Sequence, residues 1–164
     1  MRLRESTDAE TRLMSAALSP LLAELDDPAF LRGVCKIGLA VAITSRINAS
    51  AVPGAGTPCT FTLIVTEGAL ARLPEPLLRA VLAHELGHVA LKHSGRNTRA
   101  YEAAADQFAV KLLRRLEPRY PDACIQLVYV FSALAEHGAV TTSWFSAHPS
   151  PDRRAETALE GCNR

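Results

Sequence analysis

The sequence predicts an α+β domain that is mostly helical, with a small antiparallel β-sheet or hairpin at about residues 37–66. Two observations lead to this class. Residues 60–66 (Thr-Phe-Thr-Leu-Ile-Val-Thr) are mostly β-branched or aromatic, which is typical of a strand. From residue 67 onward, apolar residues recur at helical spacing between prolines and glycines. The sheet is expected to lie beside the helix that carries the most distinctive motif of the chain.

The first half of the chain contains the predicted strands. Residues 36–47 are rich in Ile, Val and Ala and partly alternate, which predicts a strand. Residues 48–58 are dense in Pro, Gly, Ala and Ser, which predicts a loop. We expect the strands 36–47 and 60–66 to pair antiparallel. Strand 60–66 is either an ordinary core strand or one whose edge binds an extended peptide, and both can hold because a strand can bury one face and present an edge.

The remaining elements are predicted to be helices, and Pro20 allows a kink in the first of them. A turn with a short helix is expected at about residues 26–33, and a loop at 139–149. The predicted helices span residues 7–25, 67–73, 75–94, 99–116, 121–137 and 151–159.

The length and composition suit one domain over residues 1–164, with an N-terminal helical segment (1–33) and a core segment (34–164). The net charge of +1 provides no electrostatic reason to expect nucleic acid or an anionic membrane as partner. No stretch offers the ~20 apolar residues of a membrane span, and the first residues lack the apolar region of a signal peptide. We therefore expect a cytoplasmic protein.

The four cysteines are widely spread and lack the spacing of a zinc finger. We expect them to be reduced, partly buried thiols. They are Cys35, Cys59, Cys124 and Cys162.

Residues 84–88 read His-Glu-Leu-Gly-His within a predicted helix. Positions i and i+4 share one face of a helix, so His84 and His88 can reach one metal ion. Glu85 is placed to act on a water molecule without being a ligand. Two imidazoles and a carboxylate base are what zinc-assisted hydrolysis of an amide requires.

A third metal ligand is expected on the next helix, because catalytic zinc normally takes three protein ligands. Glu102 is the best candidate, and Asp106 lies one turn further along the same face. Asp106 is placed to accept the second ring N–H of a metal-binding histidine, with His84 favoured. The alanines between them, and Gly87 in the motif helix, predict a close approach of the two helices.

These motifs resemble peptidase family M48, in particular the HtpX-type gluzincins. The resemblance extends upstream to the Asn-Ala-Ser-Ala-Val-Pro-Gly run that begins at Asn48. It extends downstream to His148-Pro149, followed by Arg154 six residues after the histidine. In total it covers roughly residues 37–160.

The resemblance implies a zincin-like fold and a zinc metalloendopeptidase that acts on peptide or protein substrates. His84, His88 and Glu102 would bind one Zn²⁺ ion, and Glu85 would activate a zinc-bound water as general base and then general acid. We hypothesise that His148 stabilises the oxyanion or covers the metal, and that Arg154 pairs with the Glu102 region.

Alternatives remain at this point. The chain could be a catalytically silent or latent module that keeps the fold without turnover, or a regulatory protease of the ImmA/IrrE type. The short spacing between His88 and Glu102 favours the latter group, but that group does not account for the Pro-Gly loop or the His-Pro motif. His93 and His137 follow no comparable pattern, and we expect them at surface or helix-cap positions.

Overall fold

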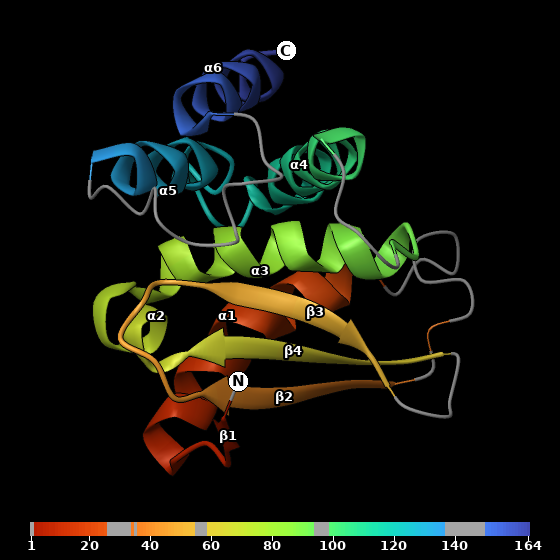
Figure 1. The fold of residues 1–164 in the computed structure, drawn as a ribbon. Coiled ribbons are helices and arrows are strands. Elements are labelled where there is room, and N and C mark those ends of the chain that lie inside the picture. Colours follow the sequence, from red (N-terminus) through yellow and green to blue (C-terminus); the bar gives the residue numbers. More distant parts are fainter. Residues whose placement is uncertain (1, 26–33, 35, 55–58, 94–98, 137–149) are drawn as a thin grey trace.

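The computed structural model describes residues 2–25, 34, 36–54, 59–93, 99–136 and 150–164. Within them a small sheet is covered by successive helices, and the predicted α+β class is confirmed. Figure 1 shows helix α3 between the sheet and helices α4 and α5, with α6 outermost. The predicted turn at 26–33 and the predicted loop at 139–149, with Trp144, Phe145 and His148, lie outside the described residues.

The sheet has four strands in the order β1-β2-β4-β3 and is mixed. Its members are β1 (Leu3–Arg4), β2 (Lys36–Ala42), β3 (Ala49–Pro53) and β4 (Thr60–Thr66). Strand β1 pairs antiparallel with β2, and β3 pairs antiparallel with β4. Strands β2 and β4 pair parallel, in register from Lys36 opposite Thr60 to Ala42 opposite Thr66.

The predicted antiparallel pairing of strands 36–47 and 60–66 is therefore wrong. The reason is a strand within the expected loop 48–58. Strand β3 lies between β2 and β4 in the sequence and runs antiparallel to β4, so β4 runs in the same direction as β2. Because β4 is paired on both sides, its edge cannot receive a substrate backbone.

The composition of strand β3 explains why the sequence predicted a loop there. Its sequence, Ala-Ser-Ala-Val-Pro, contains small residues and a proline, which have little intrinsic preference for strands. It forms because its backbone pairs with β4, from Ala49 opposite Val65 to Pro53 opposite Phe61. Proline is tolerated here because β3 lies at the edge of the sheet and Pro53 is its last residue.

The helices follow the predicted segments closely. They are α1 (Asp8–Leu25), α2 (Glu67–Arg72), α3 (Glu75–Ala90), α4 (Arg99–Leu116), α5 (Ile125–Glu136) and α6 (Pro151–Cys162). Pro20 is accommodated inside α1. Among the described residues, no helix is both long enough and apolar enough to cross a membrane.

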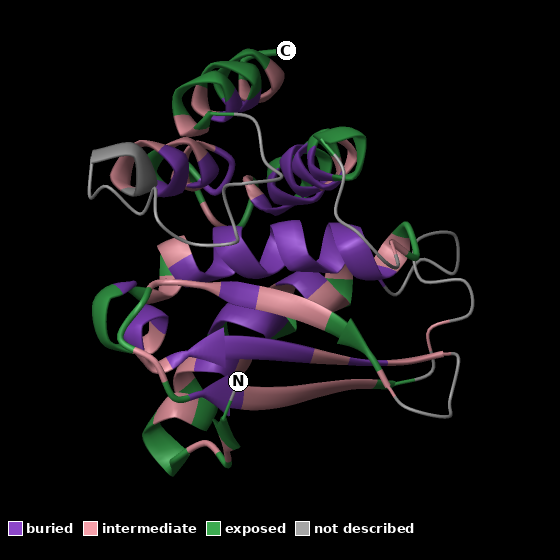
Figure 2. Ribbon diagram, in the orientation of Figure 1, coloured by how far each residue is buried: buried purple, intermediate pink, exposed green. Residues whose placement is uncertain are grey.

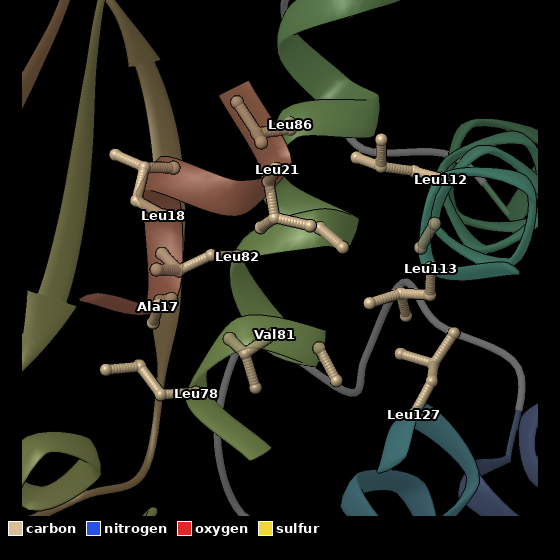
Figure 3. Close-up of a cluster of buried hydrophobic side chains, with 14 of the residues drawn as sticks. Ala17, Leu18, Leu21, Leu78, Val81, Leu82, Leu86, Leu112, Leu113 and Leu127 are labelled. Carbon is tan, nitrogen blue, oxygen red and sulfur yellow. The ribbon is translucent and has the colours of Figure 1, made fainter. Parts of the chain in front are cut away.

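Helix α3 is the centre of the core. Every residue from Leu78 to Val89 is buried, because α1 and the sheet cover one side of the helix and α4 and α5 cover the other. Figure 2 shows this continuous buried stretch, and Figure 3 shows Leu82 and Leu86 of α3 beside Leu21 of α1. Polar side chains on α3 are consequently removed from water along with the apolar ones.

The prediction of reduced cysteines is wrong. A disulfide joins Cys124, which immediately precedes α5, to Cys162 at the end of α6, with the Cα atoms 5.7 Å apart. Cys59 is also disulfide-bonded. The two cysteines of the first pair are 38 positions apart in the sequence, so only the packing of α6 against α5 brings them together.

Candidate metal centre

Two histidines of the motif helix point their ring nitrogens at one position. His84 and His88 lie one turn apart on α3 and expose only 2% and 8% of their surface. Their Nε2 atoms are 3.1 Å apart. The two Nε2 atoms are therefore close enough to bind the same metal ion.

The carboxylate of Glu102 completes the cluster from the neighbouring helix α4. Glu102 has no exposed surface, and its two oxygens lie 3.2 Å from Nε2 of His84 and 3.4 Å from Nε2 of His88. One ligand atom from each of the three residues falls within 4.8 Å of the others. Among the described residues, this is the group of histidine and carboxylate side chains whose spacing suits a metal ion.

The spacing of these atoms fits zinc. Zn–N and Zn–O bonds of about 2.0–2.1 Å in a tetrahedral site place neighbouring ligand atoms roughly 3.4 Å apart. The observed separations between the three side chains are 3.1, 3.2 and 3.4 Å. Two imidazoles and one carboxylate are also a donor set that catalytic zinc takes. The residues present therefore fit a zinc ion.

The two helices that carry the ligands are in backbone contact. A Cβ atom on Gly87 would lie 2.9 Å from both the Cα and the carbonyl oxygen of Ala105. Any side chain at position 87 would therefore push α4 away from α3. The close approach predicted from Gly87 and the alanines of α4 is present, and it brings Glu102 to the histidines.

Asp106 and Arg154 form a buried ion pair behind His84. Oδ1 of Asp106 is 2.8 Å from Nδ1 of His84, so the contact expected between them is present. Arg154, from α6, donates to both carboxylate oxygens of Asp106, at 2.7 and 2.8 Å. It also lies 3.8 Å from a carboxylate oxygen of Glu102, within ion-pair distance, so it contacts the Glu102 region named in the sequence hypothesis and approaches Asp106 more closely.

These contacts shift the pKa of both Asp106 and His84. Burial favours the neutral form of Asp106, but hydrogen bonds from Arg154 and His84 outweigh burial and hold the pKa of this carboxyl below its usual value. Burial also lowers the pKa of His84, yet hydrogen bonds to Asp106 and Glu102 raise it to about 9. The carboxylates around His84 thus stabilise positive charge at this position.

Glu85 is buried beside the cluster, with 3% of its surface exposed. His148 lies outside the described residues. The structure brings together the five other residues predicted to bind the metal or support its ligands, which are His84, His88, Glu102, Asp106 and Arg154. A further residue was not anticipated at the site. His93, expected at a surface or cap position, follows the end of α3, but its ring faces His88. Its position five residues after His88, just beyond the helix, is the sequence signal that could have indicated it.

Comparison with known families agrees with this geometry. The family model described as Peptidase family M48 matches residues 29–98 and 94–161, which is most of the chain. The chain belongs to peptidase family M48. Its membership supports a metallopeptidase domain that acts on protein or peptide substrates. No curated protein and no solved structure matches the chain. The matched residues of the M48 domain include α3, α4 and α6, which contribute the cluster and its ion pair.

Proposed function

We propose that this M48 chain is a zinc-dependent metalloendopeptidase. The observation that carries the proposal is the convergence of His84, His88 and Glu102, whose ligand atoms lie within 4.8 Å of one another in the core. A zinc ion, when bound, would act as a Lewis acid on the scissile carbonyl and make a water molecule a stronger nucleophile. The three residues would hold this ion.

Glu85 would transfer the protons. It directly follows a metal-binding histidine on α3 and is itself buried. Its carboxylate would remove a proton from the attacking water and then deliver a proton to the leaving amine. The low exposure of Glu85 would strengthen its electrostatic interaction with substrate, because little bulk water screens it.

Asp106 and Arg154 would keep His84 in the productive orientation. The hydrogen bond between Asp106 and Nδ1 of His84 leaves Nε2 of that ring facing Glu102. Arg154 donates two hydrogen bonds to Asp106 and holds its carboxylate in place. The carboxylate in turn would hold the imidazole ring of His84 in place. His148 would stabilise the oxyanion or cover the metal, as the sequence suggests.

Strand β3 is the better candidate for binding the substrate backbone. It forms one edge of the described sheet and packs next to α3. An extended peptide could add to this edge as a further strand, with main-chain hydrogen bonds supplying affinity. This replaces the hypothesis for strand 60–66, which is paired on both sides.

The cellular location remains a prediction. The sequence favours the cytoplasm, but the Cys124–Cys162 disulfide argues against it, because structural disulfides persist mainly in oxidising compartments. Alkylating the protein at the moment of cell lysis and counting modified cysteines by mass would decide whether the bonds exist in the cell.

The function is tested with Glu85→Gln. We expect the variant to keep a full equivalent of zinc and lose cleavage of an unfolded protein substrate by at least about a hundredfold. Glu156→Gln, on the exposed face of α6, is the matched control and should cleave like the unmodified chain. Zinc binding without cleavage by the unmodified chain would favour the silent module. Unchanged cleavage by Glu85→Gln would rule out the proposed mechanism.

A further inference from the structure

The C-terminal end of α3 turns back on itself. Lys92 adopts a left-handed conformation with φ of 53°. Its N–H donates to the carbonyl of Val89 at 3.1 Å, and the N–H of His93 donates to the carbonyl of His88 at 3.0 Å. These two bonds and the positive φ make up a Schellman motif, which ends a helix by reversing the chain. The reversal carries residue 93 back along the helix toward residue 88.

The ring of His93 consequently lies against a predicted metal ligand. Nδ1 of His93 is 2.9 Å from Nδ1 of His88. A face of the His93 ring stacks on Tyr101, with the ring centroids 4.2 Å apart and the planes 9° from parallel. Tyr101 directly precedes Glu102 on α4, so His93 is held between the two helices that supply the ligands.

We propose that His93 is a positioning residue that accepts a hydrogen bond from Nδ1 of His88 and thereby aims Nε2 of His88 at the metal. The inference rests on the proposed function. A metal-binding histidine usually donates its other ring N–H to a fixed acceptor. Nε2 of His88 faces Glu102, so Nδ1 is the nitrogen that carries the proton. His93 then accepts through Nδ1 and carries its own proton on Nε2.

The two metal-binding histidines therefore have different partners. His84 contacts the carboxylate of Asp106, whose charge is compensated by Arg154. His88 contacts an imidazole, which is neutral when it accepts a hydrogen bond. A neutral acceptor orients the ring without adding negative charge to a site that already contains Glu102. The ion would keep more of its positive charge for polarising substrate.

The first test measures zinc affinity by competition with a chromophoric chelator. We expect His93→Ala to bind zinc 10–100-fold more weakly than the unmodified chain. In His93→Asn the amide oxygen falls near the place of Nδ1, and affinity should return to within about threefold of the original. Lys92→Gly is the control, since glycine keeps the positive φ, and it should bind zinc normally. Affinity of His93→Ala within twofold of the unmodified chain, or equal losses in both His93 variants, would overturn the proposal.

A second test needs no variant at position 93. Nitrogen-15 NMR of the zinc-loaded, unmodified protein should show His88 protonated on Nδ1 and His93 protonated on Nε2. The opposite tautomer at His93 would overturn the proposal even if both His93 variants failed to fold. His88→Ala separates this inference from the proposed function: if it binds zinc as tightly as the unmodified chain, the metal centre itself is wrong, whatever His93 does.

Discussion

Gly87 and Ala105 are in direct backbone contact, and this contact sets the distance between α3 and α4. A Cβ on Gly87 would meet the Cα and the carbonyl oxygen of Ala105 at 2.9 Å. His88 adjoins Gly87, and Glu102 lies about one turn before Ala105. The separation of 3.4 Å between Nε2 of His88 and Oε1 of Glu102 therefore depends on position 87 having no side chain.

Gly87→Ala should separate the ligands. Alanine is the better helix former by about 1 kcal/mol, but the clash is with backbone atoms that cannot rotate away. We expect a net loss of roughly 1–3 kcal/mol in the free energy of unfolding, as for other overpacked cores, and weaker zinc binding. Urea unfolding and chelator competition measure the two effects.

Gly161→Ala is the matched control for this prediction. Its added Cβ would meet Cγ1 of Val110 at 2.9 Å, which is the end of a side chain that can adjust. We expect a smaller loss of stability and unchanged zinc affinity. If Gly87→Ala binds zinc as tightly as the control does, the helix spacing does not set the ligand geometry.

Arg154→Met should destabilise the protein strongly. Arg154 is 3% exposed, and its guanidinium donates twice to Asp106 and lies 4.1 Å from the centroid of the Phe131 ring. Without it the buried carboxylate loses its main partner, which typically costs about 3–5 kcal/mol. Zinc affinity should fall as well, because Asp106 no longer holds His84 firmly. Arg153→Met, at the exposed neighbouring position, should change the unfolding free energy by less than about 1 kcal/mol.

The Cys124–Cys162 disulfide should stabilise the fold by restricting the unfolded chain. It closes a loop of 38 residues, for which loop entropy predicts a contribution of roughly 2–4 kcal/mol. Measured in the absence of reductant, Cys162→Ser should lower the unfolding free energy by that amount. Thr157→Ser, on the exposed face of the same helix, is the control. Identical urea curves for the two variants would contradict this contribution.

The pairing of Arg4 with Glu10 should make the unfolding free energy depend on pH in the acid range. Hydrogen bonds from Arg4 hold the pKa of Glu10 at about 2, below its ordinary value of 4.5. A carboxyl whose pKa is lower in the folded state stabilises the fold fully above pH 4.5 and loses that contribution as the pH falls toward 2. Glu10→Gln should therefore be less stable than the unmodified chain at pH 6, and the difference should shrink by pH 3.

Glu5→Gln is the control for the acid dependence, since Glu5 is exposed. Its unfolding free energy should follow that of the unmodified chain at both pH values. A difference between Glu10→Gln and the unmodified chain that stays constant from pH 6 to pH 3 would contradict the role of the Arg4 pair.

The sequence by itself determined the features that depend on local interactions. The helices α1 to α6 and strand β4 lie where periodicity, proline and glycine placed them, because these signals act within a few residues. The spacing of His84, His88 and Glu102 was also readable, since one helical turn brings the two histidines to the same face. Peptidase family M48 followed from the same residues and is confirmed by the family match.

Only the tertiary structure decided the features that join distant parts of the chain. The parallel pairing of β2 with β4 depends on β3, whose residues have little strand preference of their own. The disulfide and the ion pair between Arg154 and Asp106 both require α6 to pack on α5 and α4. The contact of His93 with His88 depends on a backbone reversal and on stacking against the next helix. Each of these arises from packing between elements, which the pattern within a single element does not contain.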